Sequence, residues 1–124
     1  LGAAEYALVG GCKHIILCER GMSVAHTHKS SSRYMLDLQV IPAIKEMSSI
    51  SVASDPSHAT FWRDWVAPMS LASISAGADS IMIEVHPDPE NAAVDPLQPI
   101  NFLDFRKLMK QMDKTAQAIS RKIL

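Results

Sequence analysis

The chain has 124 residues, is 48% hydrophobic and carries a formal net charge of −1. This length and apolar content suit one domain with a packed core, without an internal boundary between residues 1 and 124. The scattered basic residues indicate neither a nucleic-acid surface nor a basic membrane face. No apolar run approaches the roughly 20 residues that span a bilayer, and no secretory signal is visible. We therefore expect a cytoplasmic protein that binds neither nucleic acid nor membranes.

The two cysteines, Cys12 and Cys18, are too few for a disulfide framework, so we expect reduced thiols.

Apolar strand-like runs alternate with helical patterns along the chain. Pro42 lies inside one helical pattern, which predicts a kink there. Asn101 followed by Asp104 resembles a helix N-terminus. In chain order we expect helix 1–11, strand 14–18, polar loop 21–33, helix 35–49, strand 50–54, helix 65–78, strand 80–85, Pro-rich loop 86–99 and helix 101–122.

A repeated strand–helix order is typical of parallel sheets with right-handed crossovers. The repeat length of about 30 to 35 residues is that of one βα unit in a barrel. The chain is too short for a complete (β/α)8 barrel, which usually needs about 250 residues. The predicted fold is therefore α/β, with parallel (β/α) units that form about three strands of a TIM-type (β/α)8 barrel.

Each of the three predicted strands ends in a polar motif: CERG at 18–21, DPSHAT at 55–60 and EVHPDPE at 84–90. The active site of an α/β barrel lies at the C-terminal ends of its strands. We therefore expect Arg20, His58 and Glu84 to converge on one rim.

The residue types in these motifs suit metal and anion binding, although each also has a simpler interpretation. His58 could ligate a metal with Asp55 or Ser57 orienting it, or could hydrogen-bond the following turn. Glu84 could ligate a cation or pair with a basic side chain, and Asp95 could be an ordinary turn residue. Arg20 could hold a phosphate or carboxylate in a bidentate contact, or pair with Glu19.

Taken together, CERG, DPSHAT, EVHPDPE and the Asp95 that follows them resemble the C-terminal half of a 3-deoxy-D-arabino-heptulosonate 7-phosphate (DAHP) synthase of the short, barrel-only type. The resemblance runs from about Ala3 to the end of the chain. The related 3-deoxy-octulosonate 8-phosphate synthases tend to have HRG and DATHS at two of these places, so the motifs favour the first family.

The resemblance implies a transferase of the first shikimate-pathway step, which condenses phosphoenolpyruvate with erythrose 4-phosphate and releases phosphate. It implies that His58, Glu84 and Asp95 are catalytic and ligate one divalent metal, which would be Mn, Fe, Co or Zn. Arg20 would contact phosphoenolpyruvate, and His86 would lie beside the substrate.

In the family, a further cysteine ligand and the substrate-binding lysines come from segments that precede the part matched by this chain. We therefore expect the 124-residue chain to be inactive alone and to form a homo-oligomer or need the N-terminal half of the barrel. The alternatives are a non-catalytic fragment that self-associates or complements an N-terminal half, and a 3-deoxy-octulosonate 8-phosphate synthase.

The chain departs from the family pattern in two loops. Phe61 and Trp62 stand where the family commonly has Gly and a basic residue. The second loop looks longer than the one usual in the family, so no role is carried onto it. Its basic residues could contact a phosphate or belong to ordinary solvated surface, and they are His26, His28, Lys29 and Arg33.

Overall fold

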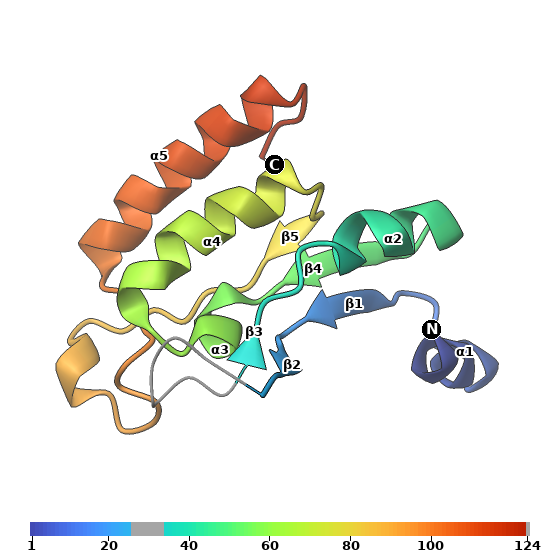
Figure 1. Ribbon diagram of the computed structural model, residues 1–124, viewed down its shortest axis with the longest axis horizontal. Helices are drawn as coiled ribbons and strands as arrows, with labels where there is room; N and C mark the ends of the chain where they lie inside the picture. Colours follow the sequence, from blue (N-terminus) through green and yellow to red (C-terminus); the bar gives the residue numbers. More distant parts are fainter. Residues whose placement is uncertain (26–33, 124) are drawn as a thin grey trace.

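The computed structural model describes residues 1–25 and 34–123. Its strands and helices are arranged as shown in Figure 1. They are α1 (Gly2–Val9), β1 (Ile16–Glu19), β2 (Met22–Ser23), β3 (Tyr34–Met35), α2 (Val40–Met47), β4 (Ser51–Ser54), α3 (Pro56–Thr60), α4 (Arg63–Ser75), β5 (Ser80–Ile81), the 3-10 turn η1 (Pro89–Asn91) and α5 (Phe102–Ala118).

The central sheet has three strands in the order β1-β4-β5, and both pairings are parallel. Its register places Cys18 beside Ala53 and Ala53 beside Ser80. A parallel bridge between Val85 and Ile100 adds a further position beyond β5. The predicted α/β fold with parallel strands is confirmed, and the bridge shows that the chain also holds the start of a next unit.

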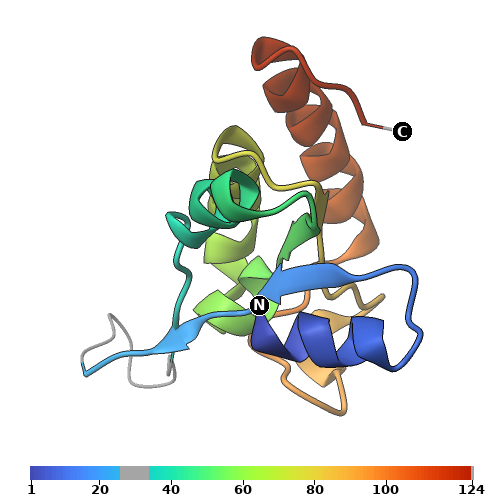
Figure 2. The same cartoon turned by 90° about the vertical axis from the view of Figure 1, so that its right-hand side faces the viewer.

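Helices α2 and α4 lie on one side of the sheet, and α5 packs against α4 (Figures 1 and 2). One core cluster joins α4 and α5 around Val66, Leu108 and Met112, and Ile81 and Ile83 of the sheet pack on it. Burying each large side chain of this kind stabilises the fold by roughly 1.5–3 kcal/mol. The apolar stripe predicted for the last helix is therefore the face that fixes α5.

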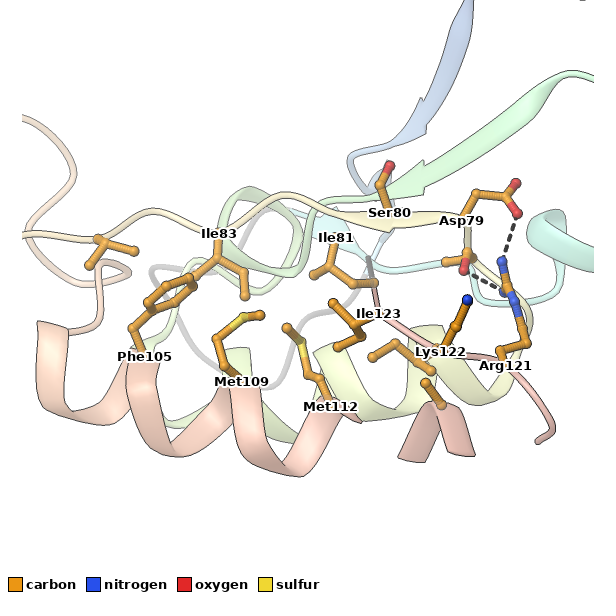
Figure 3. Close-up of a pocket in the computed structure, with 14 residues that line it drawn as sticks. Asp79, Ser80, Ile81, Ile83, Phe105, Met109, Met112, Arg121, Lys122 and Ile123 are labelled. Atoms are coloured by element: carbon orange, nitrogen blue, oxygen red, sulfur yellow. Dashed lines mark hydrogen bonds and ion pairs between the residues drawn. The ribbon is translucent and has the colours of Figure 1, made fainter. Parts of the chain in front are cut away.

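A hollow of about 550 Å3 lies between the strand side chains Ile81 and Ile83 and the α5 side chains Phe105, Met109 and Met112 (Figure 3). Its lining is mostly apolar and, within the described residues, includes none of the polar residues expected at the active site. It therefore belongs to the helix-covered side of the sheet.

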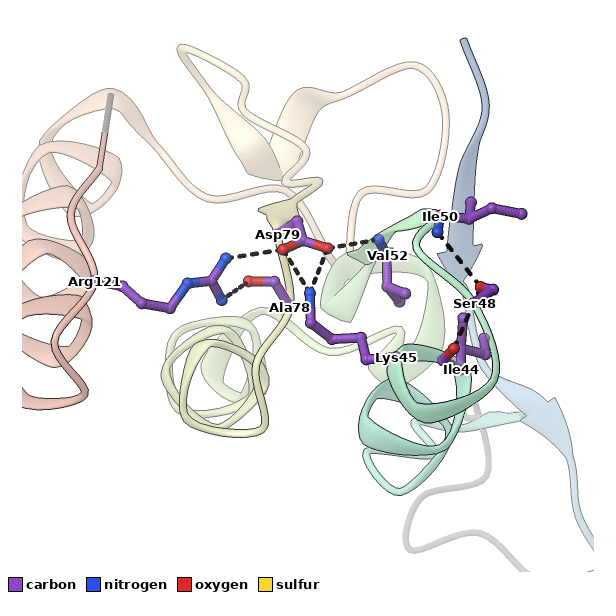
Figure 4. A network of polar contacts seen from close by, with 8 residues as sticks. All are labelled: Ile44, Lys45, Ser48, Ile50, Val52, Ala78, Asp79 and Arg121. Carbon is purple, nitrogen blue, oxygen red and sulfur yellow. Dashed lines mark hydrogen bonds and ion pairs between the residues drawn. The ribbon is translucent and has the colours of Figure 1, made fainter. Parts of the chain in front are cut away.

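At the N-terminal end of β5, Asp79 is hydrogen-bonded to α2, to β4 and to the segment that follows α5 (Figure 4). Its carboxylate accepts hydrogen bonds from Lys45 Nζ at 2.7 and 2.8 Å, from Val52 N–H at 2.9 Å and from Arg121 Nη2 at 2.9 Å. Partial burial alone would raise the Asp79 pKa, but the hydrogen bonds from Lys45 and Val52 and the charges of Lys45 and Arg121 outweigh it, so the net pKa is lowered. This end of a parallel sheet serves stability rather than catalysis.

Helix α2 begins at Val40, five residues later than predicted, because residues 34–35 pair with β2 in a small antiparallel sheet. Pro42 consequently lies in the first turn of the helix, where a missing N–H leaves no hydrogen bond unmade, so the predicted kink was wrong. The expected strand 80–85 is regular only over Ser80–Ile81.

The face of the sheet opposite the helices exposes apolar side chains. Ile16 is 62% exposed and Met82 is 50% exposed, whereas Ile81 and Ile83, on either side of Met82, pack on the core. Within residues 1–25 and 34–123, no helix is long and apolar enough to cross a membrane.

Candidate metal and substrate site

The segment DPSHAT forms the short helix α3 directly after β4. Asp55 caps its N-terminus, since its Oδ1 accepts a hydrogen bond from His58 N–H at 3.1 Å. Pro56 follows as the first helical residue, which suits its fixed φ and missing N–H. The local sequence therefore places the His58 side chain at the C-terminal end of the strand.

The imidazole ring of His58 lies between two carboxylates. Its Nδ1 is 2.7 Å from Oδ2 of Asp55, and its Nε2 is 3.0 Å from Oε1 of Glu84. Asp55 is fully buried, and an ionised carboxylate only accepts hydrogen bonds, so Nδ1 carries the proton. The Nε2 atom then faces a second carboxylate, and either a second proton on the ring or a cation held between Nε2 and Glu84 satisfies this contact.

Glu84 is held by two neighbours. Its backbone N–H donates to Ser57 Oγ at 3.0 Å, and its Oε2 accepts a hydrogen bond from Gln98 Nε2 at 2.6 Å. Oε1 is thereby directed toward His58. Of the two residues expected to orient His58, Asp55 bonds the ring, whereas Ser57 supports Glu84.

Asp95 reaches the same place from the loop between Val85 and Ile100. The loop is fixed at its two ends, because His86 N–H donates to Ile100 O at 3.0 Å and Ile100 N–H donates to Glu84 O at 3.1 Å. Asp95 has a φ of 49°, a left-handed conformation that Asp tolerates better than most residues. One ligand atom from each of His58, Glu84 and Asp95 lies within 4.8 Å of the others.

This donor set fits a divalent metal. Metal–ligand bonds of about 2.0–2.2 Å place neighbouring ligand atoms roughly 3.0–3.6 Å apart, and the 3.0 Å between His58 Nε2 and Glu84 Oε1 lies at the short end of that range. One imidazole and two carboxylates suit Mn, Fe, Co or Zn. The buried Asp55 on Nδ1 is the carboxylate partner that metal-bound histidines commonly have.

Arg20 lies beside this group at the end of β1. Its Nε is 3.6 Å from Asp55 Oδ2, and its side chain is 62% exposed. Glu19, the other partner considered for Arg20, accepts hydrogen bonds from the backbone N–H groups of Gly21 and Asp37. Gly21 has a φ of 97°, and a Cβ there would lie 3.0 Å from Ala59 Cα, so only glycine lets this turn pack on α3.

The other residues considered from the sequence are His86, the two cysteines and the basic loop. Within the described residues, the potential metal ligands that come together do not include His86, whose Nδ1 contacts the backbone of Asp88 at 2.7 Å to O and 3.1 Å to N. Cys12 and Cys18 are free thiols, as expected. Partial burial raises the pKa of Cys18, and the Asp55 charge raises it further, which keeps this thiol protonated. The loop residues His26, His28, Lys29 and Arg33 lie outside the described residues.

Gln98 was missed by the sequence analysis. Its side chain is fully buried, and its Oε1 has no hydrogen-bond partner among the described residues, although Nε2 bonds Glu84. Its backbone N–H donates to Asp95 O at 3.2 Å, so Gln98 contacts both acidic residues of the group. Its position three residues after Asp95 was a signal, but a glutamine in a Pro-rich loop is not distinctive in a single sequence.

The sequence of this chain matches a known protein family. The family model described as the DAHP synthetase I family matches residues 1–121. The chain belongs to the DAHP synthetase I family. It is 40% identical over 121 residues to the phospho-2-dehydro-3-deoxyheptonate aldolase of Thermotoga maritima, covering 98% of this chain and 35% of that protein.

Solved structures of this family share the fold. The crystal structure of the Thermotoga maritima phospho-2-dehydro-3-deoxyheptonate aldolase (DAHP synthase) matches with a TM-score of 0.90 at 40% identity, over 98% of this chain and 35% of that one. A truncated form of the DAHP synthase from Thermotoga maritima also matches with a TM-score of 0.90, over 45% of its chain. The described sheet is accordingly part of a TIM-type barrel.

The chain thus spans about a third of the length of its 40% identical relative. Weaker similarity extends to 2-dehydro-3-deoxyphosphooctonate aldolases, such as that of Methylococcus capsulatus, which is 27% identical over 93% of this chain and 44% of that protein. The order of identities agrees with the motif comparison, which favoured the DAHP synthases.

Proposed function

We propose that this chain supplies part of the active site of a metal-dependent 3-deoxy-7-phosphoheptulonate synthase. This transferase of the first shikimate-pathway step would condense phosphoenolpyruvate with erythrose 4-phosphate and release phosphate. Membership of the DAHP synthetase I family supports the proposal. The observation that carries it is the group formed by His58, Glu84 and Asp95 at the C-terminal ends of the parallel strands.

The residues have separate tasks in this proposal. His58 would ligate the metal through Nε2 and Glu84 through Oε1, and Asp95 would ligate it through its carboxylate. Asp55 keeps the proton on Nδ1 of His58, which leaves the Nε2 lone pair for the metal. Gln98 occupies Oε2 of Glu84 and so restricts which oxygen can act as a ligand. The bound metal would supply a Lewis acid for the aldehyde oxygen of the sugar phosphate.

Arg20 would bind phosphoenolpyruvate. Its exposed guanidinium lies at the rim beside Asp55, and a guanidinium can bind a carboxylate or phosphate through two parallel hydrogen bonds. Holding the two substrates in register accounts for much of the rate gain in such a condensation. A bond would form between C3 of phosphoenolpyruvate and the aldehyde carbon, water would add at C2, and phosphate would leave with C–O cleavage. His86 stays a candidate for a position beside the substrate.

The test uses the intact protein, which here means this chain together with the rest of its barrel. Phosphate release is measured with phosphoenolpyruvate and either erythrose 4-phosphate or arabinose 5-phosphate. We expect turnover with erythrose 4-phosphate, its loss in His58→Ala, and its loss on removal of the metal by a chelator. Preference for arabinose 5-phosphate would instead support a 3-deoxy-octulosonate 8-phosphate synthase, which the 2-dehydro-3-deoxyphosphooctonate aldolase relatives make the second candidate. Turnover with neither sugar would favour the non-catalytic alternative.

The proposal also covers how the chain assembles and where in the cell it acts. The exposed apolar face at Ile16 and Met82 supports burial against the rest of a barrel or against another copy of the chain. The cytoplasmic location stays a prediction.

A further inference from the structure

Arg63, the first residue of α4, joins that helix to the loop that carries Asp95. Its Nε donates to Pro99 O at 2.7 Å, and its Nη2 donates to Pro96 O at 2.7 Å. Its backbone N–H donates to Leu97 O at 2.8 Å. Three carbonyl groups between residues 96 and 99 therefore accept hydrogen bonds from one residue of a helix.

The loop needs such support where it passes the site. Asp95 adopts a left-handed backbone conformation, which costs aspartate less than most residues but is still disfavoured without support from its surroundings. The next residue is Pro96, whose carbonyl accepts a hydrogen bond from Nη2 of Arg63. Proline at 96 and 99 leaves both positions without a backbone donor, so their carbonyls are the groups through which a neighbour can fix this stretch.

We infer that Arg63 is a positioning residue, which sets the affinity of the metal site by fixing the loop that presents Asp95. The inference rests on the proposed metal site and adds to it a residue outside the ligand group. Arg63 acts through the backbone of the loop, whereas Gln98 acts directly on Glu84.

The shape of the guanidinium explains why arginine suits this position. Its planar fork directs Nε and Nη2 to two carbonyls at once, and Nη1 forms an ion pair with Glu90. A lysine ammonium keeps the charge and can keep the pairing with Glu90, but it cannot span both carbonyls in the same fixed geometry. The backbone bond from residue 63 to Leu97 is independent of the side chain. Arg63→Lys therefore removes the two-carbonyl contact selectively.

The experiment is calorimetric titration of the metal-stripped intact protein with Co2+. We expect Arg63→Lys to raise the Kd of Co2+ about tenfold, in the range that partners of metal ligands typically show. The matched control is Glu90→Gln, which removes the ion pair of a side chain that is 77% exposed and leaves both carbonyl bonds in place. Because exposed ion pairs contribute little, it should change the Kd by no more than about twofold.

A double-mutant cycle separates a role through Asp95 from a general effect on folding. In an Asp95→Ala background, Arg63→Lys should leave the Kd of Co2+ within about twofold, since the ligand that it positions is gone. An equal loss of affinity in both backgrounds, or no loss in either, would overturn the inference. Failure of the unsubstituted protein to bind Co2+ would instead reject the metal site and the proposed function with it.

Thermal unfolding of each variant accompanies the titrations. If Arg63→Lys does not fold, Arg63→Gln provides the second test, because its amide can bond one of the two carbonyls. Loss of the native circular dichroism spectrum in both variants would show that Arg63 holds the fold as a whole, and the positioning role would be rejected.

Discussion

Asp55→Asn tests the coupling between the cap of α3 and His58, the proposed metal ligand. In the native site each carboxylate oxygen accepts one N–H of His58, Oδ1 from the backbone and Oδ2 from ring Nδ1. Asparagine has the same shape but one acceptor oxygen, so one of these N–H groups must face an amide NH2. The backbone N–H cannot move its proton, whereas the ring can adopt its other tautomer. We expect the amide oxygen to stay on the backbone and the NH2 to face the ring.

The expected result follows from the tautomer. With Nδ1 as the acceptor, the proton lies on Nε2, and the lone pair that would bind the metal is lost unless the tautomer reverts. We expect the metal Kd to rise about 10- to 100-fold, equivalent to about 1.4–2.7 kcal/mol. Because the cap bond is kept, the free energy of unfolding of the metal-free protein should fall by less than about 1 kcal/mol, whereas losing a cap costs about 0.5–2 kcal/mol.

The assay is titration of the metal-stripped intact protein with Mn2+ or Co2+, combined with denaturant unfolding. Asp113→Asn makes the same chemical change on α5, where Asp113 bonds Gln117, and should leave the metal Kd unchanged. An unchanged metal Kd in Asp55→Asn, with unchanged stability, would refute the assignment of Nε2 of His58 as a ligand.

Three further predictions concern the substrate, the acid stability and the assembly. Arg20→Ala should raise the KM for phosphoenolpyruvate about 10- to 100-fold, because a charge-assisted contact is worth roughly 1.5–3 kcal/mol; initial rates measure it, and an effect confined to the sugar substrate would contradict it. The lowered pKa of Asp79 contributes stability that is present above its unfolded value of about 3.9 and lost as pH falls through the lower folded value. Asp79→Asn should therefore lower the melting temperature at pH 7 and converge with the unsubstituted protein in strong acid; a constant difference across that range would contradict this. The purified 124-residue polypeptide should show no turnover and should self-associate through the face that exposes Ile16 and Met82, which sedimentation as a folded monomer would refute.

The sequence predicted what depends on strand order and on residues next to strands. His58 and Glu84 come directly after apolar runs of a parallel sheet, so their convergence followed from topology. Asp95 lies in a loop of irregular backbone, and its place in the group came from the family resemblance. The parallel sheet itself followed from the alternation of strands and helices.

The contacts that tune the site could not be predicted, because they arise from tertiary packing. Gln98 and Arg63 act on residues 14 and 27–36 positions away, and no local pattern distinguishes them from other polar loop residues. The start of α2 was also set by distant contacts, since Met35 pairs with Met22 instead of continuing the helix. Helical periodicity gave no warning of this pairing.

The register between β4 and β5 has a consequence for how the protein is assembled. His58 and Glu84 follow neighbouring strands, and they meet because Ser54 lies beside Ile81. A slip of one residue would turn the Glu84 side chain to the opposite face, and a slip of two would carry it about 6.6 Å along the strand. Affinity for the proposed metal would therefore report whether the two strands are correctly aligned. Metal titration can then serve as a sensitive measure of native assembly when segments of such a barrel are split, fused or recombined.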